Sequence, residues 1–85
     1  MDLAPSAEVL LRHLAASYRR NGHLPTSLTE AQLGSAWNPP DPAALNFGLN
    51  LLVAHGVLEP RGSEYSVTLV GMRYIGDLAK SSVTN

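Results

Sequence analysis

The chain has no cysteine among its 85 residues, which excludes a disulfide framework and a thiolate metal site. No apolar run approaches the roughly 20 residues that a membrane-spanning helix needs. The N-terminal stretch has no basic region ahead of its apolar residues, so we expect no signal peptide and a reducing, cytoplasmic location. The hydrophobic fraction of 45% is enough for one modest core. We therefore predict a single domain over residues 1–80 and a frayed tail at 81–85.

Charge is also scarce and unevenly placed. Charged residues make up 15% of the chain, against about 25% in typical domains, and the formal net charge is -1. Residues 21–60 contain no Lys or Arg, although they contain the acids Glu30, Asp41 and Glu59. A nearly neutral surface favours association with protein and gives no general attraction to nucleic acid. Any basic patch has to come from cations outside this block, which are Arg12, Arg19, Arg20, Arg61, Arg73 and Lys80.

Start and stop signals predict two helices before residue 40. The first begins near the N-cap candidate Ser6 and ends at Gly22, which suits the left-handed position after a helix. Its apolar stripe consists of Val9, Leu10, Leu14 and Tyr18, with Leu11 beside it. The second helix is short, spans roughly Glu30–Trp37 and is capped by Thr29. Consecutive prolines at 39 and 40 must end it, because proline lacks an amide donor and clashes with a continuing helix.

A third helix is predicted to restart at Asp41, with Pro42 at its first position, where proline is tolerated. It continues to Gly56. Its core face is formed by Leu45, Leu49, Leu52 and Val53, which fall within about 100° of arc. Asn46 and Asn50 lie on a different face.

The remaining sequence predicts a hairpin and a last helix. Residues 57–60 form a strand with Pro60 at its end, residues 61–64 form a turn in which Gly62 supplies a positive φ, and residues 65–67 form the second strand. Thr68 is expected to cap the last helix, and Gly71 to permit close packing near the strand. The inner positions of that helix are predicted to be Met72, Ile75, Leu78 and Ala79.

Residues 52–71 carry a resemblance to a known family. Leu52 followed by Gly56-Val57-Leu58 leads out of the third helix, and residues 65–71, YSVTLVG, are similar to the Y-x-L-T-x-x-G pattern of many MarR-like and PadR-like regulators. The chain therefore resembles the winged helix-turn-helix superfamily. This resemblance implies a mainly helical α+β fold: a three-helix core, a small β-wing of two or three strands and a C-terminal helix.

The resemblance also implies a DNA-binding transcriptional regulator whose third helix enters the major groove. Asn46 and Asn50 would then face base edges, since Asn pairs with adenine. The phosphate contacts would come from the turn and the end of the first helix, at Arg61, Ser63, Arg19 and Arg20. Solvated polar faces, a hairpin turn and the helix dipole account for the same residues without DNA. With so few cations a monomer would bind weakly, so a dimer would be needed for affinity.

The second interpretation is a protein-interaction winged helix that does not bind DNA. The low charge, the cation-free residues 21–60 and the apolar pair Phe47 and Leu51 favour it. We expect this pair to pack in the core against Trp37; if exposed, it would mark a protein-binding patch. Convergence of the arginines beside the N-terminus of the third helix would favour DNA, whereas scattered arginines would favour a protein partner.

Nothing in the sequence predicts an enzyme, a cofactor or a metal. The histidines at 13, 23 and 55 lack the i, i+4 spacing of helical metal ligands, and Glu8 and Asp77 are isolated from other acids. We expect no paired-carboxylate catalysis and no catalytic triad.

Overall fold

The computed structural model describes residues 4–25 and 27–83, with the backbone alone for 81–83. The fold is mainly helical α+β, with helices followed by an antiparallel hairpin and a C-terminal helix, and it is consistent with the predicted winged helix. In chain order the elements are α1 (Pro5–Asn21), β1 (Leu28–Thr29), α2 (Glu30–Gly34), α3 (Pro42–Ala54), β2 (Leu58–Arg61), β3 (Glu64–Val67) and α4 (Leu69–Val83).

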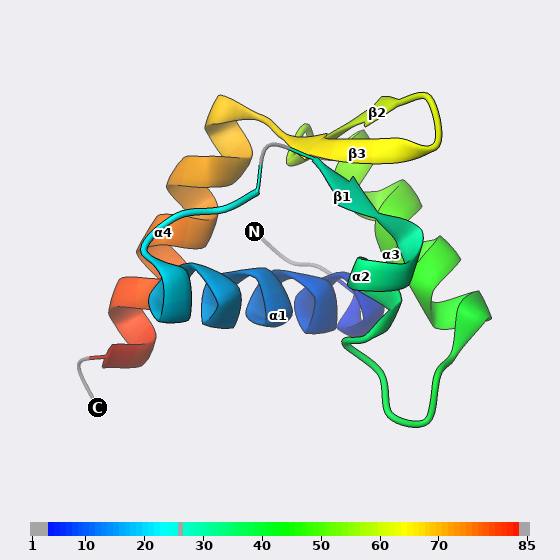
Figure 1. Cartoon of the computed structure of the whole chain (residues 1–85), viewed down its shortest axis with the longest axis horizontal. Coiled ribbons are helices and arrows are strands. Elements are labelled where there is room, and N and C mark those ends of the chain that lie inside the picture. Colours follow the sequence, from blue (N-terminus) through cyan, green and yellow to red (C-terminus); the bar gives the residue numbers. More distant parts are fainter. Residues whose placement is uncertain (1–3, 26, 84–85) are drawn as a thin grey trace.

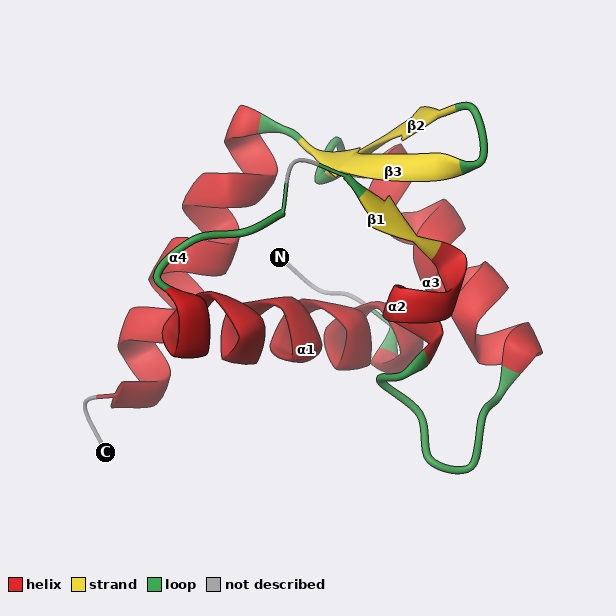
Figure 2. Ribbon diagram, in the orientation of Figure 1, coloured by secondary structure: helices red, strands yellow, loops and turns green. Residues whose placement is uncertain are grey.

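Helix α1 forms the base of the molecule and packs against both α3 and α4, which rise on opposite sides of it (Figure 1). The strands lie together at the end of the molecule away from α1, as the colouring by secondary structure shows (Figure 2). The short α2 stands in front of α3 in this view and is joined to it by residues 35–41. This connection is longer than the three- or four-residue turn of a compact helix-turn-helix.

The sheet has the strand order β1-β3-β2, and both pairings are antiparallel. The hairpin closes through a two-residue turn, Gly62-Ser63, in which Gly62 has a φ of 62° and only glycines adopt positive φ among the described residues. A positive φ at the first turn position matches the hairpin turn that favours glycine there. Pro60 lies inside β2 instead of at its end, which is tolerated because β2 is an edge strand.

Two glycines let the elements approach closely. A Cβ on Gly48 of α3 would lie 2.8 Å from Leu10 Cδ1 and 2.9 Å from the carbonyl oxygen of Ser6, both on α1. A Cβ on Gly71 of α4 would collide with the carbonyl oxygen of Val57, as the sequence predicted for this glycine. The contact between α1 and α3, and the contact of α4 with Val57 just before β2, therefore each depend on the absence of a side chain.

The core is aliphatic and draws on all four helices and the sheet. Its buried members are Ala7, Leu10, Leu11, Leu14, Ala15, Leu24, Leu28, Leu33, Leu49, Leu52, Val57, Leu58, Ile75 and Ala79. The prediction was wrong for Met72, which is 46% exposed, and it placed Val9 and Tyr18 too centrally on α1. Helix α1 is covered by α3 and α4 on two sides, so its buried arc centres on Leu10 and Leu14.

Side-chain caps mark three helix starts as predicted, and at the last of them the Thr68 hydroxyl accepts from the Gly71 amide at 3.0 Å at the start of α4. The Thr29 hydroxyl accepts from the Gln32 amide at 3.2 Å, while the Gln32 side chain accepts from the Thr29 amide at 2.9 Å, which completes a capping box. Asp41 Oδ1 accepts from the Ala44 amide at 3.1 Å at the start of α3.

Other helix boundaries differ from the prediction. Helix α1 begins at Pro5, so Ser6 lies within its first turn and is not the cap. Helix α2 ends at Gly34, which leaves Trp37 in the connection to α3. The backbone of α4 is helical through Val83, into the segment predicted to fray. No helix within residues 4–25 and 27–83 is both long and apolar enough to cross a membrane.

Candidate interaction surface

Helix α3 presents one exposed side to solvent, which we call the outer face. It consists of Ala43, Asn46, Phe47, Asn50 and Ala54. The spacing of three or four residues puts these side chains in one stripe along the helix. Phe47 is 53% exposed at the middle of the stripe, and the two asparagines lie beside it.

The opposite side of α3 fixes this orientation. Leu49 and Leu52 are buried in the core, and Gly48 is buried against α1.

The sequence correctly placed Asn46 and Asn50 away from the core. The prediction that Phe47 packs in the core was wrong, because Gly48, not Phe47, occupies the close approach to α1. Leu51 is partly buried and packs against the core, so it does not belong to the outer face.

The wing, which is the hairpin of β2 and β3, carries a single cation, Arg61, and this cation is paired with an acid. Arg61 Nη2 lies 3.6 Å from Glu59 Oε2, and both side chains are largely exposed. Residues two apart on a strand point to the same side, so the sequence contained the signal for this pair. Ser63 is exposed in the turn. An exposed pair of this kind is weak, at about 0.2–1 kcal/mol, yet it lowers the net positive charge that the wing offers to a phosphate.

Thr68 ties the base of the wing to α4. Its hydroxyl donates to the carbonyl oxygens of Gly56 and Val57, and it accepts from the Gly71 amide at 3.0 Å. Its amide donates to the Val57 carbonyl at 3.0 Å. The end of α3, the start of β2 and the start of α4 therefore meet at one side chain, which positions the hairpin relative to α3.

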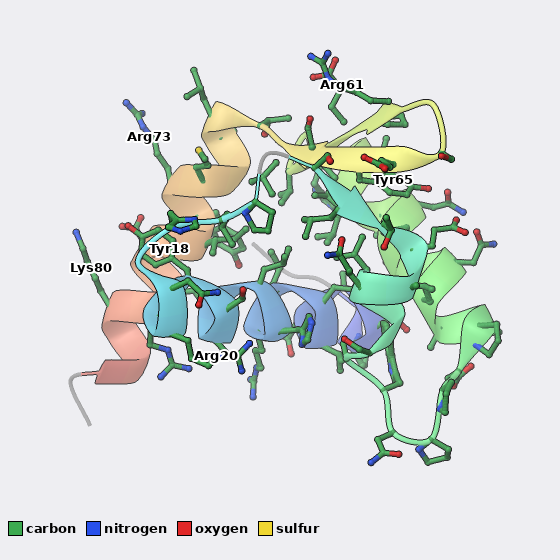
Figure 3. The ribbon with its side chains drawn as sticks, viewed as in Figure 1. Tyr18, Arg20, Arg61, Tyr65, Arg73 and Lys80 are labelled. Atoms are coloured by element: carbon green, nitrogen blue, oxygen red, sulfur yellow. The ribbon has the colours of Figure 1, made fainter. Side chains whose placement is uncertain are left out.

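The labelled cations do not converge beside the N-terminus of α3 (Figure 3). Arg73 and Lys80 project from α4, and Arg20 projects from the C-terminal half of α1, all on the side of the molecule away from α3. Arg61 points out above the sheet. Arg20 and its neighbour Arg19, also exposed, are in the last turn of α1, where cations complement the helix dipole.

Arg12, the arginine of α1 that precedes the last turn, is paired with an acid. Arg12 Nη2 lies 4.0 Å from Glu8 Oε2, one turn earlier on the helix. The arginines are thus dispersed over α1, the wing and α4, the distribution that the sequence analysis linked to a protein partner.

A groove of about 410 Å³ adjoins the outer face, between α2 and the start of α3. We call it the Trp37 groove. Its lining includes the apolar residues Ala31, Trp37, Pro42 and Leu45 and the acids Glu30 and Asp41. The sequence analysis missed this groove because it assigned Trp37 to a longer α2.

A second apolar area was also missed, at the start of α4. Leu69 is 82% exposed, and the neighbouring Val70 and Met72 are also exposed. Leu69 and Val70 line a shallow depression with Arg73. The sequence could have predicted this area, because a helical wheel places Leu69, Val70 and Arg73 on the side of α4 opposite the buried Ile75.

Chemically, the surface offers apolar contact and amide hydrogen bonding. No group of three or more His, Asp or Glu side chains that could hold a metal ion occurs in the part of the chain that the structure describes. His13 is close enough to Ser35 for a hydrogen bond, at 3.3 Å between Nε2 and Oγ, and this contact joins α1 to the end of α2.

Comparison with known proteins gave no match to a family model, a curated protein or a solved structure.

Proposed function

We propose that this chain is a protein-interaction winged helix that binds its partner through the outer face of α3. The observation that carries the proposal is the exposure of Phe47, at 53%, in the middle of a helix face that a winged helix commonly uses for recognition. Covering the exposed part of such a side chain contributes about 1–2 kcal/mol to binding. Asn46 and Asn50 beside it supply donors and acceptors that fix the orientation of a partner.

The charge distribution supports a protein over DNA. Residues 21–60, which include all of α3, contain no Lys or Arg, and Arg61 of the wing is paired with Glu59. Affinity for DNA comes largely from cations that neutralise phosphates and release counterions. An aromatic anchor within a neutral polar rim is instead the usual composition of a protein interface.

Site-specific photo-crosslinking tests the proposal. Benzoylphenylalanine in place of Phe47 keeps an aromatic side chain at the centre of the outer face, and the same residue in place of the exposed Asp77 on α4 is the matched control. In cells that produce the protein, we expect a discrete protein adduct from position 47 and none from position 77. The isolated partner should bind the native protein at least tenfold more tightly than Phe47→Ala, as for a binding hot spot. Equal adducts from both positions would refute the proposal.

A second candidate function, DNA binding, is favoured by one observation. Asn46 and Asn50 are both exposed and lie one turn apart on the same face, as side chains that contact adjacent bases would. A mobility-shift titration on random duplex at low salt tests it, with Asn50→Ala and Arg61→Ala as controls. We expect no shift up to tens of micromolar protein. A shift that both substitutions weaken would replace the first proposal with a DNA-binding regulator, with phosphate contacts from Arg61, Ser63, Arg19 and Arg20.

A further inference from the structure

The Trp37 groove has an aromatic wall that is held in place. Trp37 is partly buried and packs against the hydrophobic core, while it also lines the groove. Leu45 shows the same combination from the first turns of α3. The groove is therefore formed by side chains that the core anchors, so an occupant meets a preformed apolar surface. An indole face is also the best aromatic partner for a cation.

Two carboxylates give this apolar groove a negative charge. Glu30 and Asp41 both line it, and both are exposed. Elsewhere on the surface Glu8 and Glu59 pair with arginines, whereas neither Glu30 nor Asp41 has a salt bridge among the described residues. Asp41 uses Oδ1 to cap α3, which leaves its second carboxylate oxygen for another donor. The sequence within 21–60 supplies no Lys or Arg to neutralise them.

We propose that the Trp37 groove receives an arginine side chain from the protein partner that binds the outer face. This inference rests on the proposed function of α3. A guanidinium is flat, stacks on an indole and presents five donors, so it can contact Trp37 and hydrogen-bond carboxylates at the same time. The aliphatic stem of the arginine fits the apolar residues Pro42 and Leu45.

The groove and the outer face are continuous along α3. Pro42 lines the groove, and Asn46 of the outer face lies one turn further along α3, so these two residues are neighbours on the helix surface. One helical turn rises about 5.4 Å, so a short partner segment spans both features. The partner segment is thus expected to carry an arginine and, one or two residues away, an apolar side chain for Phe47.

Fluorescence provides a direct test, because Trp37 is the only tryptophan of the chain. The probe is the peptide acetyl-Leu-Arg-Leu-amide, with acetyl-Leu-Gln-Leu-amide as the neutral control. At low salt we expect a saturable change in tryptophan fluorescence with the arginine peptide, in about the millimolar range. The glutamine peptide should bind at least about threefold more weakly, because it lacks both the ion pair and the cation–π contact at an exposed site. Equal binding of both peptides, or no saturable signal, would overturn the inference.

Substitutions localise the effect. Glu30→Gln and Asp41→Asn remove one charge each, and Asn still caps a helix, so both variants should fold normally. Each should weaken binding of the arginine peptide by about threefold, whereas Asp77→Asn on α4 should leave it unchanged. Unchanged binding in both groove variants would refute the assignment of the site. Circular dichroism of each variant confirms that the fold is retained.

The outcomes separate this inference from the proposed function. If the partner crosslinked at position 47 binds the double variant Glu30→Gln, Asp41→Asn as tightly as the native protein, the inference fails and the α3 surface stands. If the arginine peptide binds but position 47 gives no adduct, the proposed function fails, and the inference about its partner with it. The other candidate occupant of the Trp37 groove is a second copy of this chain. That copy would insert Arg73, which lies beside the exposed Leu69 and Val70 on α4. Concentration-dependent self-association that Arg73→Ala abolishes would assign the groove to that copy and overturn the proposal.

Discussion

Replacing each of two glycines of α4 with alanine should change stability in opposite directions. Alanine is favoured over glycine inside a helix by about 1 kcal/mol, and this gain applies equally at positions 71 and 76. At Gly76 a new Cβ meets no atom within 4 Å, so Gly76→Ala should raise the free energy of unfolding by up to about 1 kcal/mol. At Gly71 the new Cβ collides with the Val57 carbonyl oxygen and lies 3.0 Å from Val57 Cγ1.

The cost at Gly71 follows from what the Val57 carbonyl already does. That oxygen accepts from the Thr68 amide at 3.0 Å and from the Thr68 hydroxyl at 3.2 Å. Overpacking costs about 1–3 kcal/mol, and each hydrogen bond weakened by the shift costs about 1 kcal/mol more. After the propensity gain is subtracted, Gly71→Ala should destabilise the fold by about 2–4 kcal/mol.

Thermal unfolding followed by circular dichroism measures both variants. For a domain of this size 1 kcal/mol corresponds to about 4–8 °C in Tm. Gly71→Ala should therefore lower Tm by at least about 8 °C, while Gly76→Ala should raise it by a few degrees. If Gly71→Ala were as stable as the native protein, the close approach of Gly71 to Val57 described above would be wrong. If both variants lost stability equally, helix propensity and the space around each glycine would not determine the change in the free energy of unfolding.

Three further changes have expected outcomes. Gly48→Ala should lower the urea midpoint by the equivalent of up to about 2 kcal/mol after the helix-propensity gain of about 1 kcal/mol is subtracted, because its Cβ would press on Leu10 and Ser6 of α1; a raised midpoint would contradict that contact. Asp41→Ala should cost about 1 kcal/mol by the same assay and Asp41→Asn much less, and equal losses would argue against the Ala44 cap. Phe47→Ser should leave the free energy of unfolding within about 0.5 kcal/mol of the native value, since the side chain is exposed; a large loss would place Phe47 in the core after all.

Local chemistry explains what the sequence predicted well. The caps at Thr29 and Asp41, the positive φ of Gly62 and the tight junction at Gly71 each depend on one residue type with a specific backbone requirement. Together with the pattern in residues 65–71 they were sufficient for the fold. Such signals are readable because they involve neighbours within a few residues.

Burial was harder to predict because it depends on which neighbours an element acquires. Phe47 and Met72 have the residue type of a core position, yet α3 turns Gly48 inward and α4 turns Gly71 inward, and both large side chains face solvent. Periodicity defines the width of an apolar arc, and tertiary packing decides its centre. The candidate site was predicted only in part. The sequence correctly placed Asn46 and Asn50 on the exposed side of α3, but it wrongly placed Phe47 in the core.

The Thr68 junction makes the length of the wing independent of the rest of the fold. Because this side chain joins the carbonyls of Gly56 and Val57 to the start of α4, the hairpin is secured at its base, while the pairing of β1 with Glu64 and Tyr65 holds β3 up to the turn. Gly62 and Ser63 at the tip are exposed, and surface loops tolerate insertions because lengthening a flexible loop costs little closure entropy. Residues can therefore be inserted between Gly62 and Ser63 to extend the reach of the surface, while the scaffold that presents α3 remains unchanged.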